Sequence, residues 1–326
     1  MRIQKPHFLT LFLTSLGVLL SGCWAPETEN SVDVHSGNKP IAVVCTTNVI
    51  KDLVRQIGGS RVTVTAIMDG PGIDPHRYTP SPKDTNALTA ADLVVYSGLH
   101  LEGQFDGALE SLENRGIPVI CVTDGLRSEV PSRLIQTGTG VADPHVWFDP
   151  QLWSTCGDSL AQQLGEFDPD GKEVYLLAAE AFSKRMQETQ AEALQILELI
   201  PEDQRVLVTA HDAFEYFARV FKFKVEAVQG ISTESEPGLR RVNELIALLS
   251  EKHIAAVFAE QSVSDKNISA LIEGCNSRGH VLKIGGRLFS DTVGAEGTPE
   301  ETLSGALLYN VREIASALGD IEGLVP

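Results

Sequence analysis

Short runs of apolar residues alternate along the chain with amphipathic segments of helical period. In the first half, the predicted buried strands are residues 41–47, 62–68, 93–97 and 118–122. The helical patterns between them are residues 48–57, 82–91 and the segment around 103–112. Buried strands that alternate with helices are typical of a parallel sheet with crossover helices, so this half predicts an α/β lobe.

The same alternation returns towards the C-terminus without any sequence identity between the halves. The predicted strands there lie near residues 205–209, 224–228, 255–259 and 280–284. The helices between and after them include residues 264–273 and 301–318. The chain is therefore predicted to be an α/β protein with two (β/α) lobes, each built on a parallel four-stranded sheet.

One long helical pattern separates the two lobes. Residues 172–200 contain neither glycine nor proline, and Pro201 ends the run. Apolar side chains recur at four-residue steps, with Leu177 and Ala181 beside Val174, Ala178, Phe182 and Met186. About thirty helical residues span roughly 45 Å, more than one small domain needs. We interpret residues 167–201 as a linking helix between lobes 40–166 and 202–326; the alternative is a long helix packed on a single domain.

The N-terminus has the pattern of an export signal. Arg2 and Lys5 precede an apolar run over residues 8–20 that is too short to span a bilayer comfortably. The run ends in Leu20-Ser21-Gly22-Cys23, which resembles the bacterial lipoprotein cleavage box. We therefore predict a signal peptide at 1–22, lipid on Cys23, and a polar tether at 23–39. The alternative is an ordinary secretory signal followed by a chance cysteine, and both predict export.

Charge and cysteine usage narrow the classes of partner. The chain has 26 Lys plus Arg against 44 Asp plus Glu, and the leader removes two basic residues, so the mature charge is 24 − 44 = −20. Such acidity excludes nucleic acid as a partner, because phosphates would be repelled. No CxxC motif occurs, and the sequence alone does not determine the disulfide state of Cys45, Cys121, Cys156 and Cys275.

The clearest chemical signal is a repeated tripeptide, Asp-Pro-His. It ends at His76 in a loop after the second predicted strand, and again at His145. Open parallel sheets bind ligands beyond the carboxyl ends of their strands. Proline stiffens the loop, and the preceding carboxylate, Asp74 or Asp143, can orient the imidazole of a metal ligand. A single loop histidine is more often only hydrogen-bonded, but the repetition favours metal ligation.

Two residues occupy equivalent places in the second lobe. His211 follows the predicted strand 205–209 and opens a predicted helix, and Asp291 lies beyond the strand that ends near residue 284. Each could instead be a capping or turn residue. Two groups from each lobe, all beyond strand ends, would converge in a cleft between the lobes. Glu260, at another strand terminus, is a weaker candidate for supporting this site.

In this order the motifs resemble the solute-binding proteins of metal ABC importers, the TroA/ZnuA-like family often called cluster A-I. The resemblance covers residue 39 to the C-terminus and rests on VVCTTNVIKDLVRQIGG, DPHRYTPSPKD, ADLVVYSGLHLE, DPHVWFDP, TAHDAFEYFAR, QGISTESEP and IGGRLFSD. It implies two lobes joined by a rigid helix, with metal ligands at His76, His145, His211 and Asp291. It also implies a monomer that delivers its metal to an ABC permease with an ATPase subunit.

Zinc is the predicted cargo, with manganese as the alternative. Neutral imidazoles suit zinc, and four protein ligands fill its tetrahedral shell as in a closed carrier site. The resemblance associates histidine at the third position, His211, with zinc. However, residues 124–142 lack the histidine-rich loop that many zinc-uptake members carry. The other function classes are a secreted zinc hydrolase, for which the HExxH motif is absent, and an adhesin lipoprotein stabilised by metal.

Overall fold

The computed structural model describes residues 39–138 and 140–319, and the predicted signal peptide and Cys23 lie outside these residues. The first lobe contains a parallel sheet in the order β2-β1-β3-β4. Its strands are β1 (Ile41–Thr47), β2 (Val62–Met68), β3 (Leu93–Tyr96) and β4 (Val119–Cys121). Its helices are α1 (Asn48–Gly58), α2 (Pro82–Thr89), α3 (Asp106–Glu113) and α4 (Asp124–Glu129). The predicted α/β lobe is confirmed.

Local sequence explains where these elements begin. In β1 nearly every side chain is buried, as expected of a central parallel strand that is covered on both faces. The Thr47 hydroxyl caps α1 by accepting a hydrogen bond from the Ile50 N–H. At α2, Ser81 and Asp84 form a capping box, and Pro82 occupies the first turn.

The second lobe has four strands in two parallel pairs, β5–β6 and β7–β8. The strands are β5 (Val206–Thr209), β6 (Lys224–Ala227), β7 (Ala256–Glu260) and β8 (Lys283–Leu288). The helices are α7 (Glu215–Phe221), α8 (Leu239–Lys252), α9 (Lys266–Ser277) and α10 (Leu303–Gly319). β5 and β7 lie next to each other, but the named ladders do not join them into one sheet. The β7–β8 pairing has a register shift at Val257/Phe258, where Gly285 of β8 is the extra residue.

β8 lies further along the chain than predicted, because Gly285 and Gly286 belong to the strand and not to a loop. A Cβ atom on Gly285 would lie 2.6 Å from the Ala317 Cβ and 2.8 Å from a Phe258 ring carbon. The glycines thus allow α10 to approach the strand closely. The helix predicted to open at His211 also begins later, at Glu215, because the His211 backbone N–H bonds to the Glu260 carboxylate.

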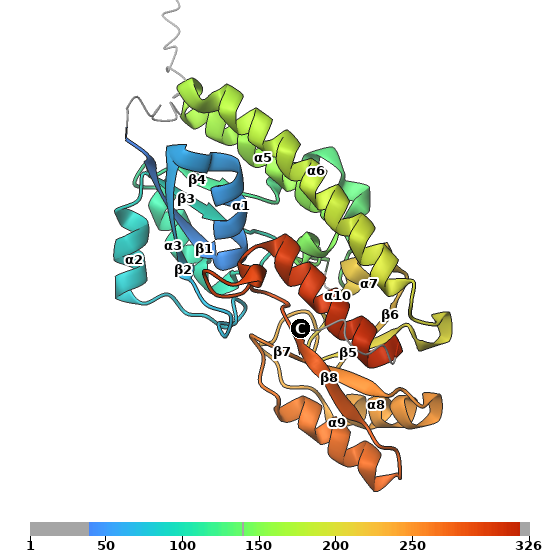
Figure 1. Ribbon diagram of the computed structural model, residues 1–326. Coiled ribbons are helices and arrows are strands. Elements are labelled where there is room, and N and C mark those ends of the chain that lie inside the picture. Colours follow the sequence, from blue (N-terminus) through green and yellow to red (C-terminus); the bar gives the residue numbers. More distant parts are fainter. Residues whose placement is uncertain (1–38, 139, 320–326) are drawn as a thin grey trace, which may run out of the picture. The chain divides into compact units, whose positions relative to one another are not determined.

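The predicted long helix is α6 (Lys172–Leu197), 26 residues that span about 39 Å. It packs along α5 (Pro150–Phe167) and α1 of the first lobe and against α10 of the second (Figure 1). Phe182 and Met186 are buried as predicted, but Val174 and Leu177 are 50% and 60% exposed. Tyr175 is buried instead, since its hydroxyl donates to Asp168.

Short 3-10 segments connect several of these elements. They are Gly59–Arg61, Gly103–Phe105, Pro131–Arg133, Val146–Phe148, Pro169–Gly171, Glu202–Gln204 and Pro299–Glu301. One apolar core cluster runs through both lobes and includes Trp153 of α5, Phe182 of α6, Phe217 of α7 and Phe258 of β7. The lobes therefore share packed interior surface.

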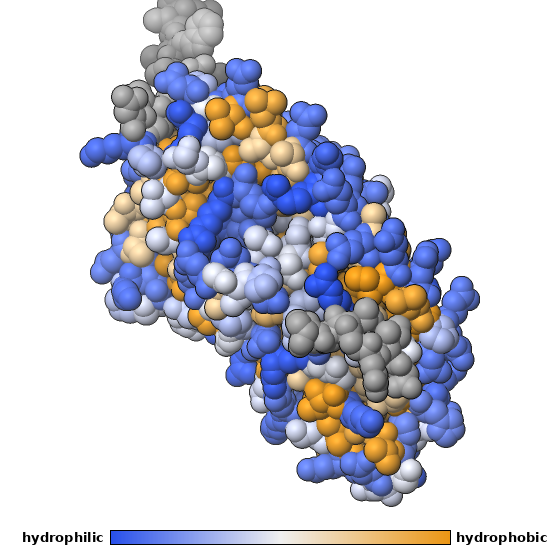
Figure 2. Space-filling model, viewed as in Figure 1, coloured by the Kyte–Doolittle hydropathy of each residue, from blue (hydrophilic) through white to orange (hydrophobic). Residues whose placement is uncertain are grey.

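The surface is mostly hydrophilic in the view of Figure 2, with apolar side chains in separate patches. Among the described residues, no helix is long and apolar enough to cross a bilayer. The four cysteines in this part of the chain, Cys45, Cys121, Cys156 and Cys275, are buried and free of disulfides. They act as small apolar core residues.

Candidate metal centre

The two Asp-Pro-His loops share one hydrogen bond between the aspartate side chain and the histidine backbone. The Asp74 Oδ1 atom accepts the backbone N–H of His76 at 2.9 Å, and Asp143 Oδ1 accepts that of His145 at 2.9 Å. Asp143 also lies 2.7 Å from His145 Nδ1. A hydrogen bond from Nδ1–H to this carboxylate leaves the His145 Nε2 lone pair free to ligate. Both loops therefore share the hydrogen bond from the aspartate to the histidine backbone, but only Asp143 contacts the imidazole of its histidine.

His211 is oriented by Glu260 in a similar way. Glu260 lies at the end of β7 and is fully buried, as is His211 beyond the end of β5. One carboxylate oxygen of Glu260 accepts the His211 backbone N–H at 2.8 Å, and the other contacts Nδ1. Both the backbone and the ring of His211 are thereby fixed, with Nε2 directed away from Glu260.

Asp291 lies three residues beyond the end of β8 and has two unequal carboxylate oxygens. Its Oδ2 atom accepts hydrogen bonds from the hydroxyls of Ser262 at 2.9 Å and Ser290 at 3.4 Å. Its Oδ1 atom is buried and has no hydrogen-bond partner in the structure. A buried carboxylate oxygen without a donor is costly unless a cation or a proton satisfies it.

The four predicted residues converge on one point. His145 Nε2 lies 3.3 Å from His76 Nε2, 3.4 Å from His211 Nε2 and 3.2 Å from Asp291 Oδ1. Asp291 Oδ1 also lies 3.3 Å from His211 Nε2 and 4.0 Å from His76 Nε2. Zinc–nitrogen bonds of about 2.0–2.1 Å place tetrahedral ligand atoms about 3.3 Å apart. The donor set and its spacing therefore fit a small tetrahedral cation.

Charges inside the cluster shift the pKa of each histidine differently. Burial lowers the pKa of His76 to about 3 and keeps that ring neutral. Burial also opposes charge on His145 and His211, but Asp143 and Asp291 raise the pKa of His145 to about 9. Asp291 and Glu260 raise the pKa of His211 well above its usual value. The histidines in turn hold the pKa of the buried Asp291 well below its usual range. A bound cation must therefore displace protons from His145 and His211.

Several contacts around the cluster were not predicted from sequence. Ser262 and Ser290 bond to Asp291, and Thr233 donates to the second carboxylate oxygen of Asp74. The indole N–H of Trp147 donates to the Ser290 carbonyl at 2.9 Å. These partners are far apart in sequence and have common side chains, so no local pattern marks them. The only available signal was that Ser262 follows a strand end, as His76, His211 and Asp291 also do.

The chain matches the family described as ZnuA, zinc-uptake complex component A, periplasmic, over residues 43–317. The chain belongs to this family. The resemblance stated from the sequence motifs is confirmed.

The names of its relatives refer to different metals. The chain is 40% identical over 301 residues to the manganese-binding lipoprotein MntA of Bacillus subtilis, covering 92% of this chain and 95% of that protein. It is 36% identical over 288 residues to the zinc-binding protein TroA of Treponema pallidum, covering 88% and 92%. A solved structure of that periplasmic protein superposes with a TM-score of 0.81 at 36% identity, covering 86% of this chain and 99% of that chain.

Family membership identifies the chain as a metal-binding component of an uptake system and not as an enzyme. The hydrolase alternative is therefore not favoured, and neither is the reading as an adhesin. Relatives named as lipoproteins agree with a place outside the cytoplasm. The two-lobed α/β architecture with a long helix also agrees with the TroA structure.

Proposed function

We propose that this protein captures a transition-metal dication at His76, His145, His211 and Asp291 and presents it to an ABC permease with its ATPase subunit. The observation that supports this most strongly is the convergence of four buried ligand atoms, two from each lobe, within 4.8 Å of one another. Among the described residues, the nearest ligand atoms to the buried Asp291 Oδ1 are Nε2 of His145 and of His211, so a cation bonded to all three would satisfy this oxygen. All four positions are filled by protein, which suits a carrier and not a site that binds a reactive water.

We propose zinc as the cargo, with manganese as the alternative. Three imidazole nitrogens and one carboxylate oxygen form a donor set that suits zinc well. The names of relatives include manganese, zinc and iron, so family membership alone leaves the choice open. Elemental analysis of protein isolated from its native host, followed by zinc–manganese competition, tests this assignment. Manganese as the main ion in that sample, retained against zinc, would overturn it.

Asp74, Asp143 and Glu260 are proposed to orient the ligands. Each carboxylate accepts the backbone N–H of the histidine that it supports, and Asp143 and Glu260 also hold Nδ1. Such partners fix the ring and raise the basicity of the ligating nitrogen. We expect their removal to weaken metal binding about 10- to 100-fold.

The N-terminal sequence leads us to propose further that the protein is anchored to a membrane. Lipid on Cys23 would anchor the protein through the tether at 23–39, and removal of residues 1–22 would expose that cysteine as the N-terminus. The linking region 167–201 would join lobes 40–166 and 202–326 in a monomer. Mass spectrometry of the processed N-terminus tests the anchor. An unmodified Cys23 in membrane-extracted protein would contradict it.

Substitution of the ligands tests the site itself. We expect His145→Ala or His211→Ala to weaken zinc binding at least about 100-fold, more than the loss of an orienting partner. The thermal stabilisation that the apoprotein gains on adding zinc should fall in parallel, because it depends on the affinity. His253→Asn is the matched control, since His253 is an exposed histidine outside the cluster, in a left-handed conformation that asparagine tolerates. Unchanged affinity and stoichiometry in both alanine variants would refute the assignment.

A further inference from the structure

The segment that carries Asp291 is attached to both lobes. In its own lobe, the Asn310 side chain of α10 accepts the Phe289 N–H and donates to the Phe289 carbonyl. From the first lobe, Trp147 donates to the Ser290 carbonyl. The residues on either side of Asp291 therefore have tertiary partners, and its carboxylate direction depends on more than its own side-chain torsions.

Asn48 makes the remaining attachment. This first residue of α1 is 5% exposed, and its Nδ2 donates to Thr292 Oγ1 at 2.8 Å and to the Val293 carbonyl at 3.1 Å. Its Oδ1 accepts the Val293 N–H at 3.2 Å and lies 3.0 Å from the Thr292 hydroxyl. That hydroxyl also lies 3.3 Å from the Gly70 carbonyl, just beyond β2. One buried amide thus binds the two residues that follow Asp291.

The side chain of Asn48 is not needed to form or to cap α1. The cap of α1 is supplied by Thr47, and both the donor and the acceptor of the Asn48 amide are used by residues more than 240 positions away. The Asn48 amide must both donate and accept to make these contacts, because it donates to the Val293 carbonyl and accepts the Val293 N–H. A carboxylate at this position has no N–H to donate.

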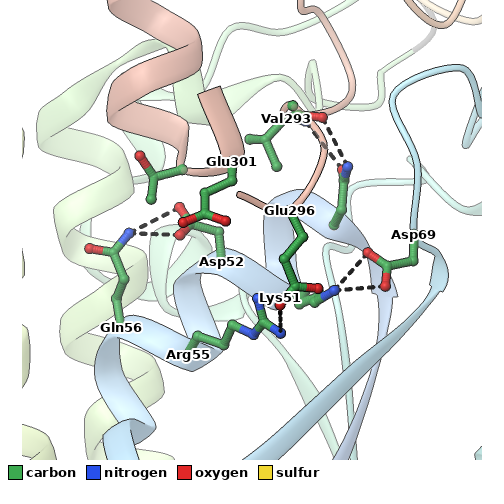
Figure 3. A pocket seen from close by; sticks show the side chains of 11 residues that line it. Lys51, Asp52, Arg55, Gln56, Asp69, Val293, Glu296 and Glu301 are labelled. Atoms are coloured by element: carbon green, nitrogen blue, oxygen red, sulfur yellow. Dashed lines mark hydrogen bonds and ion pairs between the residues drawn. The ribbon is translucent and has the colours of Figure 1, made fainter. Parts of the chain in front are cut away.

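Further along α1, the buried Asp52 accepts the Leu303 N–H at 2.9 Å at the start of α10, whereas the contact of Arg55 with the 294–301 connection is open to solvent. Arg55 pairs with Glu296 at 3.3 Å, and these side chains are 43% and 71% exposed. Figure 3 shows Val293, Glu296 and Glu301 facing Lys51, Asp52 and Arg55 across a cavity of about 240 Å³. Exposed ion pairs of this kind contribute little to folding stability. The Asn48 amide is therefore the buried contact of α1 that reaches the residues next to Asp291.

We infer that Asn48 is a positioning residue for the metal site: it acts through Thr292 and Val293 to hold Asp291 Oδ1 in ligating range. The inference rests on the proposed function, because it requires that Asp291 binds the metal. It makes the carboxylate ligand of the second lobe dependent on a helix of the first lobe. Loss of the amide should release the Asp291 segment and leave the three histidines in place.

The test is a double-substitution cycle on the full mature chain, measured with zinc and cobalt(II). We expect Asn48→Ala to weaken zinc binding about 10- to 100-fold, as for other outer partners of metal ligands. In an Asp291→Ala background, Asn48→Ala should change the affinity less than twofold, since the ligand on which it acts is already absent. Cobalt-loaded Asn48→Ala should show the visible spectrum of Asp291→Ala and not that of the unaltered protein.

Thr292→Val provides a second variant that removes the hydroxyl with little change in volume, and the same coupling to Asp291 is expected. Glu296→Ala is the matched control, because it alters the same connection at an exposed pair, and its zinc affinity should stay unchanged.

The outcomes separate the two hypotheses. If Asp291→Ala leaves the affinity unchanged, the proposed ligand set fails. If Asp291→Ala weakens binding but neither Asn48→Ala nor Thr292→Val does, only the positioning role is overturned. Equal losses from Asn48→Ala with and without Asp291 would likewise overturn it, because they would indicate general destabilisation.

Discussion

At the scale of single residues, the site combines neutral and proton-binding histidines. His76 is held neutral by burial, with its pKa lowered to about 3. His145 and His211 face carboxylates on both sides, and their pKa values lie above the usual histidine range. The apoprotein therefore holds protons near the place where a dication would bind. The cation and these protons stabilise the same buried carboxylates and exclude one another.

This competition predicts the pH dependence of binding. At pH 7, metal binding should release protons from the coupled pair His145 and His211. Because the raised pKa values mean that protons still occupy the site at neutral pH, the affinity should increase from pH 6 to about pH 9 and fall in acid. Calorimetric titration with zinc in buffers of different ionisation enthalpy counts the protons. Release of no protons at pH 7 would contradict the assigned charge states.

At the scale of elements, strand ends and loop geometry create the site. His76 and His211 follow β2 and β5, and Asp291 follows β8, so three of the ligands lie beyond carboxyl ends of strands. This could be predicted from sequence because buried apolar runs mark the strands and Asp-Pro-His repeats mark the loops. The phase of α6 could not be predicted, because an ion pair between Arg61 and Asp168 and the hydroxyl of Tyr175 select which residue is buried.

The close packing of β8 against α10 yields a prediction on stability. Gly285→Ala should destabilise the apoprotein by about 1–3 kcal/mol, because the new methyl group would overlap Ala317 and Phe258. Gly107→Ala is the control: this glycine lies in α3 with open space around its Cβ position, and alanine favours a helix by up to about 1 kcal/mol. Urea unfolding of both variants measures the difference. Equal or greater stability of Gly285→Ala would show that the strand and helix can separate without cost.

At the scale of the whole molecule, polar and apolar contacts join the two lobes around the four candidate ligands. Arg219 of α7 pairs with Asp149, the cap of α5, and the Tyr216 hydroxyl donates to the Asp143 carbonyl. Together with the shared apolar core, these contacts join the His145 loop to the element that follows His211. A binding site built in this way is largely formed before the metal arrives, which reduces the ordering that binding requires.

Such tertiary attachments set the limit of what sequence could predict. The four candidate ligands could be predicted because His76, His211 and Asp291 are chemically distinctive side chains beyond strand ends, and His145 repeats the Asp-Pro-His motif. Asn48, Thr233 and Ser262 could not, because asparagine, threonine and serine are common in loops and helix starts. Their roles arise from contacts with residues more than 28 positions away. Only the folded chain brings them to the site.

The central claim is that three imidazoles and one carboxylate bind a single cation between the lobes. X-ray absorption spectroscopy of the zinc-loaded protein tests this most directly, because it reports the number and type of atoms bonded to the metal. We predict four light-atom ligands at about 2.0–2.1 Å, with the outer-shell scattering of three imidazoles and none from sulfur. A sulfur ligand, or scattering from fewer than two imidazoles, would contradict the site.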